Sequence, residues 1–484
     1  MSKPATRKLF GPFNRVEGDL EVSVDIIDGK VASARVNSPL YRGFEQILQG
    51  KDPRDALVYT PRICGICSVA QSVAAARALA DAQGLEAARN GQLANNLILA
   101  AENAADHLTH FYLFFMPDFA RDAYRQHHWH HSIQQRFAAQ KGSSAATMLK
   151  ARAELLHLTG ILAGKWPHSL SIQPGGSSRS VSSSEKMRLG LIIAGFRQFL
   201  ETHCFADKLE RVLALDSPDQ LREWAAAHAD ADFSRFLQLS DSLQLAQSGR
   251  LATRLMSYGA YEQDGRHLFP AGVWTGQAEA LNAQQIREDI SHSWMRYQNE
   301  PQHPFQGTTE PDIEQADGYS WCKAPRLDGR VMEVGALARQ AVAGQALVRQ
   351  LLAESGSNVQ NRVIARLLEL AALIPAMEDG YKQLQPGQPF CAHAPLPQEA
   401  EGQGMIEAAR GSLGHWLRIY KGRILSYQII APTTWNFSPR DSAGQPGALE
   451  QALQGTEVGD AGENSVMIQH IVRSFDPCMV CTVH

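Results

Sequence analysis

The sequence contains no long hydrophobic run, which argues against a membrane-spanning protein. Its longest apolar stretches, such as residues 189–196, are far shorter than the roughly 20 residues that a transmembrane helix needs. The N-terminal segment also lacks the apolar core of a signal peptide. Hydrophobic residues still make up 44% of the chain, enough to bury a substantial core. We therefore expect a cytoplasmic globular protein without a membrane span.

Net charge and cysteine are scarce as well. A net charge of −4 offers no basic field for nucleic acid or for an anionic membrane surface. Only seven cysteines occur in 484 residues, too few for a disulfide framework, and four of them fall into two Cys-x-x-Cys pairs. This clustering is typical of reduced thiols in a reducing compartment.

The apolar pattern predicts an α+β fold that is mainly helical. Residues 20–27 and 30–36 alternate apolar and polar side chains around Asp28-Gly29, which predicts a small N-terminal antiparallel hairpin. A second strand-rich segment near the C-terminus covers residues 417–431. Helical periodicity marks four long segments, residues 68–112, 145–164, 185–215 and 335–384. No repeat or linker divides the chain, so we expect residues 1–484 to form a single domain.

The two Cys-x-x-Cys pairs lie at opposite ends of the chain. Cys64 and Cys67 form the first pair, Cys478 and Cys481 the second, and 410 residues separate them. Four such thiolates can enclose one soft or borderline metal ion. A structural zinc site in a non-catalytic scaffold is one interpretation, but zinc ribbons separate their pairs by roughly 12–20 residues. The pattern instead predicts a metal that closes the whole fold.

The residues around these pairs and several motifs between them resemble the large subunit of a nickel–iron hydrogenase. The first pair stands in Arg62-x-Cys-Gly-x-Cys and the second in Asp476-Pro-Cys-x-x-Cys-x-x-His484. The other matching motifs follow in the family's order: Arg15-Val16-Glu17-Gly18, Arg42-Gly43-Phe44-Glu45, Asp106-His107-x-x-His110-Phe111-Tyr112, Pro167-His168, Tyr319–Arg326, Glu333-Val334-Gly335 and Pro432–Asp441. Together they span nearly the whole chain.

The resemblance implies a Ni–Fe centre that splits H2 heterolytically. All four paired cysteines would hold nickel, and Cys67 and Cys481 would also bridge to an iron that carries one carbon monoxide and two cyanides. Soft thiolates suit nickel and leave an open position for H2. A cysteine thiolate would accept the proton first, and Glu17 would pass it outward.

Three further charged residues enter the expected site through the same resemblance. Arg440 would place a guanidinium opposite the open position. Asp106 and Asp476 would orient that arginine and line the same pocket. A separate Mg2+ site would use Glu45, the carbonyl of Ile429 and His484, since oxygen-rich ligation suits this ion.

The expected partner is an iron–sulfur small subunit. Cys204, Cys322 and Cys391 stand alone, whereas an iron–sulfur cluster normally takes four cysteines. Electrons from the Ni–Fe centre would therefore leave through a second chain, and a higher oligomer of such heterodimers is expected. The histidine-rich tract at residues 127–131 matches no family motif and is interpreted as a solvated face rather than a metal site.

Three departures from the family pattern favour its regulatory, H2-sensing branch. Gln71 replaces a histidine, and an amide donates a hydrogen bond without ever changing charge. Ile66 and Phe114 replace smaller residues at the mouth of the gas channel. The sensing interpretation adds a histidine kinase as the signalling partner and implies slow turnover. The alternative is an energy-conserving uptake hydrogenase that feeds respiration.

Overall fold

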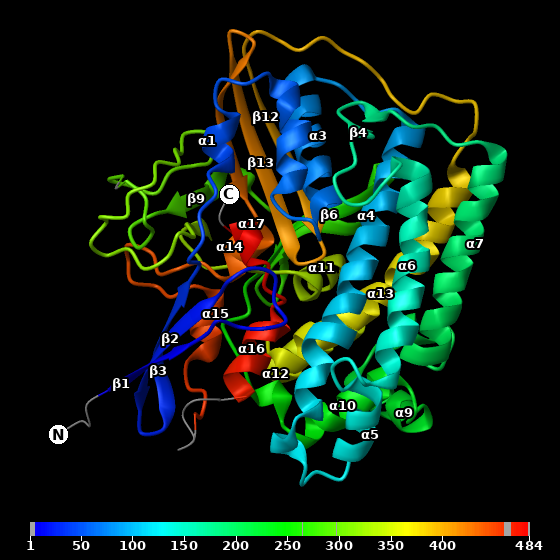
Figure 1. Cartoon of the computed structure of the whole chain (residues 1–484), viewed down its shortest axis with the longest axis vertical. Helices are drawn as coiled ribbons and strands as arrows, with labels where there is room; N and C mark the ends of the chain where they lie inside the picture. The colour runs from blue at the N-terminus through cyan, green and yellow to red at the C-terminus, as the bar shows by residue number, and fades with distance from the viewer. Residues whose placement is uncertain (1–4, 264, 297, 459–465, 483–484) are drawn as a thin grey trace.

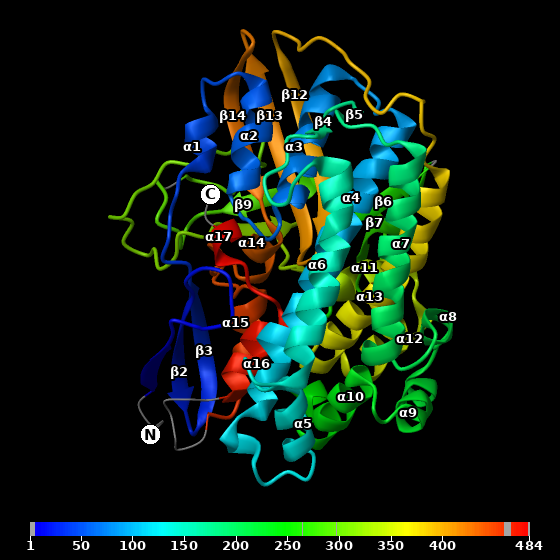
Figure 2. The ribbon, with the colours of Figure 1, turned by 45° about the vertical axis from the view of Figure 1, so that its right-hand side comes forward.

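Four long helices lie side by side and form the largest part of the molecule (Figures 1 and 2). The computed structural model describes residues 5–263, 265–296, 298–458 and 466–482. The four helices are α4 (Arg89–Thr109), α6 (Ser143–Ala163), α7 (Ser183–Phe199) and α13 (Val359–Gln383). Their facing sides carry apolar residues such as Leu97, Leu155, Ile193 and Leu370, all essentially buried. Burial of these apolar stripes is the main force that holds the helices together.

Shorter helices surround this group. They are α1 (Phe44–Leu48), α2 (Ala56–Tyr59), α3 (Ser68–Gln83), α5 (His130–Phe137), α8 (Leu209–Leu213), α9 (Pro218–Ala227), α10 (Asp232–Ser242), α11 (Ala336–Ala343), α12 (Ala346–Ser355), α14 (Pro432–Asn436), α15 (Ala448–Leu453), α16 (Val466–Ser474) and α17 (Met479–Thr482). No described helix is long and apolar enough to cross a membrane.

The strands form several small, mostly antiparallel sheets rather than one large sheet. One sheet joins β1 (Thr6–Phe10), β2 (Glu21–Ile27) and β3 (Lys30–Asn37), and another joins β12 (Ala400–Ala408), β13 (Gly411–Tyr420) and β14 (Arg423–Ile430). The third has the order β11 (Glu333–Val334), β6 (Leu255–Gln263), β7 (Arg266–Trp274), β8 (Ala278–Glu279). Two strand pairs complete the set, β4 (Ile172–Gln173) with β5 (Gly176–Ser177) and β9 (Ile286–Asp289) with β10 (Ala324–Leu327).

Glycine decides where several of the expected elements turn or end. β2 and β3 pair antiparallel, and between them Asp28 and Gly29 have φ values of 51° and 75°, as a two-residue hairpin turn requires. The helix expected over residues 68–112 is interrupted at Gly84, which has a left-handed backbone (φ 58°). The helix expected over residues 335–384 is divided into the three helices α11, α12 and α13, with breaks at Gly344 and Gly356.

The hairpin formed by β6 and β7 was not predicted from the sequence.

A close contact between α3 and β12 sets the place of the first cysteine pair. A Cβ atom on Gly402 would lie 2.1 Å from the carbonyl oxygen of Ala78, and one on Gly404 would lie 2.0 Å from that of Ala74. Only glycine therefore lets the strand approach the helix backbone this closely. Since Cys67 immediately precedes α3, this packing brings the first pair beside the β12–β13 hairpin.

The C-terminal helices return to the middle of the molecule. α16 and α17 lie between the N-terminal sheet and the long helices, with α14 beside α17 (Figures 1 and 2). The backbone N–H of Met479 donates to the carbonyl of Glu17 at 2.7 Å. The two ends of the chain thus meet directly at the second cysteine pair.

Candidate metal centre

The four paired cysteines converge on one buried point. The Sγ atoms of Cys64 and Cys478 are 3.4 Å apart, those of Cys67 and Cys481 are 3.1 Å apart, and those of Cys478 and Cys481 are 2.9 Å apart. All four sulfurs lie within 4.8 Å of one another, and none forms a disulfide. Such spacing fits sulfur ligands around a single metal ion, whose bonds to sulfur are about 2.3 Å long for zinc.

The side chain of Arg42 connects the two cysteine-containing segments. Arg42 Nη2 donates to the carbonyl of Ile63 at 2.6 Å and also to the carbonyl of Val480. One guanidinium therefore bridges the residue before Cys64 and the residue before Cys481. Arg42 belongs to a motif recognised in the sequence, but its bridging role requires the folded chain.

Charge at the cluster is shared unequally among the thiols. Hydrogen bonds from the thiols of Cys478, Cys481 and Cys67 lower the pKa of Cys64 well below its ordinary value, and the guanidinium of Arg410 adds to this effect. Hydrogen bonds with neighbouring thiols and burial raise the pKa of Cys67. Metal binding by cysteine requires the deprotonated thiolate, so the low pKa of Cys64 favours a metal-ligating form of that thiol.

Arg410 is the arginine beside the sulfurs. It lies in the turn between β12 and β13 and is 3% exposed. Its Nη1 is 2.9 Å from Asp106 Oδ2, its Nη2 is 3.1 Å from Asp476 Oδ1, and its Nε donates to the carbonyl of Asp476. Burial opposes the charge, but these carboxylates and the thiols of Cys478 and Cys64 outweigh it and raise the pKa of Arg410 well above its usual range.

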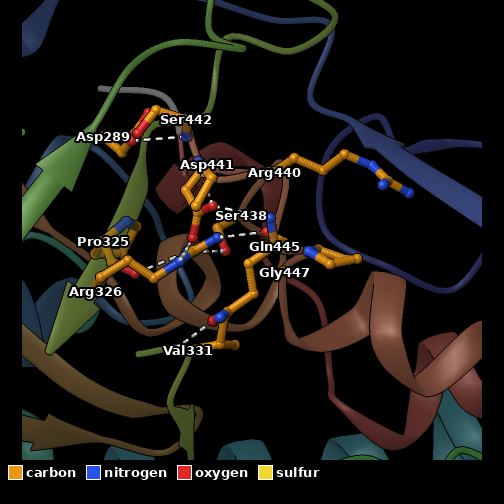
Figure 3. A network of polar contacts seen from close by, with 12 residues as sticks. Asp289, Pro325, Arg326, Val331, Ser438, Arg440, Asp441, Ser442, Gln445 and Gly447 are labelled. Carbon is orange, nitrogen blue, oxygen red and sulfur yellow. Dashed lines mark hydrogen bonds and ion pairs between the residues drawn. The ribbon is translucent and has the colours of Figure 1, made fainter. Parts of the chain in front are cut away.

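The prediction that Arg440 faces the metal is therefore wrong. Its Nη2 lies 3.0 Å from Ser33 Oγ and 3.3 Å from the carbonyl of Ala34, both in β3, and its Nε is 3.8 Å from Glu450. Figure 3 shows its side chain extending toward the N-terminal strands, away from the buried pair of Arg326 and Asp441. The Pro-Arg-Asp motif does not specify in which direction the side chain of Arg440 points; the folded backbone decides this.

A signal for Arg410 does exist in the sequence. The segment Ala408-Ala409-Arg410-Gly411 places one large cation among small residues, within a stretch of strand-forming residues. A lone charged residue at such a turn is exposed in most proteins, so the signal becomes specific only once Asp106 and Asp476 are known to face it.

The two predicted aspartates do lie in this pocket, with opposite tendencies. Burial raises the pKa of Asp106 to about 7, although Arg410 opposes the rise. For Asp476, burial opposes the charge, but Arg410 together with His110, Arg366 and His107 outweighs it and lowers the pKa. Both orient an arginine, as expected, but it is Arg410 and not Arg440.

Glu17 lies at the edge of the same site. Its backbone pairs with Cys478, and burial together with the thiol of Cys64 raises the pKa of its carboxyl group. The side chain is only partly buried. This placement suits a proton carrier, whose pKa is matched to proton exchange by its surroundings.

Gln71 is buried one helical turn beyond Cys67, but its hydrogen bond goes elsewhere than expected. Its Oε1 lies 2.8 Å from His415 Nε2, and His415 Nδ1 lies 2.8 Å from the hydroxyl of Tyr427. Its Nε2 has no hydrogen-bond partner among the described residues, so the expected donation to a thiolate is not observed. Ile66 packs against the main core, and Phe114 is partly buried within a π-helical segment at His110–Phe115. Their gas-channel role stays a prediction.

Two of the three expected magnesium ligands lie together. Glu45 Oε1 accepts a hydrogen bond from the backbone N–H of Ile429 at 2.7 Å, while His484 lies outside the described residues. Lys323 Nζ lies 3.5 Å from Glu45 Oε2 and 3.4 Å from Glu288 Oε2. Burial raises the pKa of Glu288 to about 7, and its buried Oε1 has no hydrogen-bond partner in the described structure. This donor set fits a hard cation beside the lysine.

Among the described residues, the four cysteines are the one group in which three or more His, Cys, Asp or Glu side chains converge closely enough to hold a metal ion. The histidine-rich tract at residues 127–131 forms no such group, and Cys204, Cys322 and Cys391 do not join the cluster. A zinc staple would use the same four sulfurs. It has no need, however, of a buried guanidinium and two buried carboxylates next to them.

Comparison with known proteins identifies the family. A family model described as nickel-dependent hydrogenase matches residues 42–122 and 123–484. The periplasmic NiFeSe hydrogenase large subunit of Desulfomicrobium baculatum is 29% identical, with 98% of this chain and 94% of that protein covered. The uptake hydrogenase large subunit of Azotobacter chroococcum mcd 1 is 28% identical, with 100% and 96% covered. The Hydrogenase-1 large chain of Escherichia coli (strain K12) is 28% identical, with 99% and 95% covered.

Solved structures agree. The reduced Ni-Fe-Se hydrogenase from D. vulgaris Hildenborough has a TM-score of 0.86 with this chain at 29% identity, and the match covers 99% of this chain and 100% of that chain. The family model, the relatives and the fold therefore coincide with the convergence of the cysteines. This protein belongs to the nickel-dependent hydrogenases, as a large subunit whose buried cysteine cluster suits a Ni–Fe centre.

Proposed function

We propose that the chain is the catalytic large subunit of an H2-oxidising uptake hydrogenase. The observation that carries this proposal is the guanidinium of Arg410, held by Asp106 and Asp476 beside four converging cysteine sulfurs. The relatives named as uptake hydrogenase and Hydrogenase-1 support it. One relative is named periplasmic, so the cytoplasmic location stays a prediction.

Each side chain of the site has a task in this proposal. All four cysteines would hold nickel, and Cys67 and Cys481 would also hold iron. The bound metals would supply the heterolytic cleavage of H2. A cysteine sulfur takes the proton, and the partly buried Glu17 carries it toward the surface. Arg410 would contribute a fixed positive charge beside the cysteine sulfurs, where a preorganised charge stabilises developing negative charge.

The remaining cofactors and partners follow from the same proposal. Carbon monoxide and two cyanides would be the further ligands of the iron, and an iron–sulfur small subunit would receive the electrons. Heterodimers of the two subunits would assemble further.

A magnesium ion at Glu45 is the second metal that we propose. Replacing Glu45 by Gln should remove about one Mg2+ per large subunit, because the amide cannot supply the charge that a hard cation prefers. Elemental analysis of the purified heterodimer measures this directly. Glu399→Gln, at a position outside the group formed by Glu45, Glu288 and Lys323, serves as the control. An unchanged magnesium content in the Glu45 variant would refute the site.

H2 sensing is a second candidate function, favoured by one observation. The buried Gln71 contacts His415, which in turn contacts Tyr427, and the amide of Gln71 itself carries no charge at any pH. A neutral amide next to Cys67 suits a centre selected for signalling to a histidine kinase rather than for rapid turnover. The relatives' names favour the uptake function over this one.

Turnover in the purified heterodimer separates the two functions. For an uptake enzyme we expect H2-driven dye reduction above about 10 s⁻¹, a typical rate for a metabolic enzyme, with rapid loss of activity in air. Turnover far below this rate that persists in air would contradict the uptake proposal. Such slow turnover, together with H2-dependent phosphorylation of a kinase, would establish sensing. Infrared spectra recorded under H2 and then O2 show whether the Ni–Fe centre is present in either case.

A further inference from the structure

Arg339 is a buried arginine behind the turn that carries Arg410. It lies in α11 and has no exposed surface. Its five N–H groups meet five acceptors: Nε and one Nη2 hydrogen donate to Glu369, one Nη1 hydrogen donates to Glu407, and the other two donate to the carbonyls of Ala408 and Ala409. These distances lie between 2.6 and 2.9 Å. The guanidinium therefore has no free donor and a single orientation.

Two of these acceptors are the carbonyls that immediately precede Arg410. Ala409 and Arg410 form the two-residue turn between β12 and β13, where Ala408 pairs with Gly411. Neither residue has a positive φ, so the turn is not one of the two types that strand twist favours in a two-residue hairpin. The local sequence therefore does not hold this turn by itself. The guanidinium of Arg339 supplies the missing restraint from outside.

The carboxylates bound to Arg339 extend the restraint to both sides of Arg410. Glu407 Oε1 accepts hydrogen bonds from Tyr258 N at 2.8 Å and from Ser412 Oγ at 2.6 Å, which ties the hairpin to β6. Glu369 also lies 3.0 Å from His107 Nε2, and His107 adjoins Asp106 on α4. One arginine thus connects the turn of Arg410 with the helix of its partner Asp106.

A gain in folding stability does not by itself explain this buried network of charges. Buried ionic clusters are often no more stable than apolar residues of similar volume, because burial removes the charges from water. In some proteins such clusters instead specify a unique geometry. A fixed geometry matters for Arg410, since its charge acts on Cys64 and Cys478 and its orientation decides where that charge lies.

We propose that Arg339 is a positioning residue for the hydrogenase reaction: it fixes the turn that aims Arg410 at the cysteine cluster. The inference rests on the proposed role of Arg410 beside the Ni–Fe centre. Arg339 itself touches neither substrate nor metal, so its effect should pass entirely through Arg410.

Arg326 provides a matched control. It is 3% exposed, and its donors also meet five acceptors: Asp441, the Ser438 hydroxyl and the carbonyls of Pro325, Pro439 and Gln445 (Figure 3). It holds the turn that carries Arg440, as Arg339 holds the turn that carries Arg410. Arg326→Lys therefore removes an equivalent network without disturbing the metal centre.

The test compares Arg339→Lys, Arg326→Lys and Arg410→Lys, alone and combined, in the assembled heterodimer. Lysine keeps the charge but has three donors instead of five. We expect Arg339→Lys to lower H2-driven dye reduction roughly 10–100-fold, with nickel and iron contents unchanged. The infrared stretching band of the carbon monoxide ligand should shift in the same direction in Arg339→Lys as in Arg410→Lys. Arg326→Lys should leave the rate of dye reduction and the infrared band unchanged, although we expect both Arg326→Lys and Arg339→Lys to lower the thermal stability.

The double variants separate positioning from general damage. In the Arg410→Lys background, Arg339→Lys should cost less than about twofold, because effects passing through one residue do not add. Full multiplication of the two effects, or turnover of Arg339→Lys within twofold of the parent, would overturn the inference. Normal turnover of Arg410→Lys would instead overturn the proposed role of Arg410. If Arg339→Lys does not fold, Glu369→Gln replaces it, with the same expected direction and a smaller loss.

Discussion

Replacing Arg410 by lysine is expected to lower H2-driven dye reduction roughly 10²–10³-fold, the loss typical when one preorganised electrostatic contact is removed from an active site. The lysine ammonium keeps the charge but lacks the fork that pairs with Asp106 and Asp476 simultaneously. The residue does not ligate the metal in the proposed site. Nickel and iron contents should therefore stay at the parent level, which elemental analysis of the same samples checks.

Arg440→Lys is the matched control for this experiment. Its guanidinium contacts Ser33, Ala34 and Glu450, all outside the cysteine cluster, so turnover should stay within about twofold of the parent. The pair of variants decides between the sequence-based assignment and the folded arrangement. A large loss in Arg440→Lys with little loss in Arg410→Lys would show that the assignment to Arg410 is mistaken.

Replacing Cys478 by serine should abolish both nickel binding and H2 turnover. Its sulfur lies 3.4 Å from that of Cys64 and 2.9 Å from that of Cys481, at the centre of the cluster. A serine hydroxyl is a hard, weakly acidic ligand and replaces a soft thiolate poorly at nickel. We expect less than about one tenth of the parent nickel content, because this ligand joins the two halves of the site.

Cys204→Ser controls for the loss of a buried thiol elsewhere. Cys204 is fully buried but is not part of the metal-binding cluster. Its replacement should leave nickel and turnover near parent values, with only a modest loss of thermal stability. Parent-level nickel in the Cys478 variant would exclude that cysteine as a ligand. Zinc in place of nickel and iron in the parent protein would contradict the hydrogenase assignment itself.

Local chemistry accounts for the elements that were predicted well. Asp28-Gly29 suits a tight hairpin because both residues tolerate a positive φ, and β2 and β3 pair around it. The long helices follow from apolar periodicity, but their ends depend on the conformation of single glycines. Gly84, Gly344 and Gly356 each adopt a positive φ, and this choice separates helices that periodicity alone joins. Glycine also occurs inside helices, so its identity does not announce a break.

The predicted site likewise contains residues that local motifs identify and residues that only the folded chain identifies. The four cysteines converge, Asp106 and Asp476 both contact Arg410, and the backbone of Glu17 pairs with that of Cys478. The arginine was misassigned because two candidates exist and only the path of the β12–β13 turn shows which one faces sulfur. The contact of Gln71 with His415 was also missed, since the two residues are 344 positions apart.

The sequence by itself determined which sulfur atoms can ligate a metal, and the ordered motifs around them determined the family resemblance. Ligand identity follows from residue type and from the Cys-x-x-Cys spacing, both of which are properties of the linear chain. Tertiary structure alone decided that Arg410 rather than Arg440 faces the cluster and that Arg339 holds its turn. The direction of a long side chain depends on backbone segments brought together from β12, α4, α11 and α13. The relative placement of such segments is set by the packing of the entire core, which a local motif does not encode.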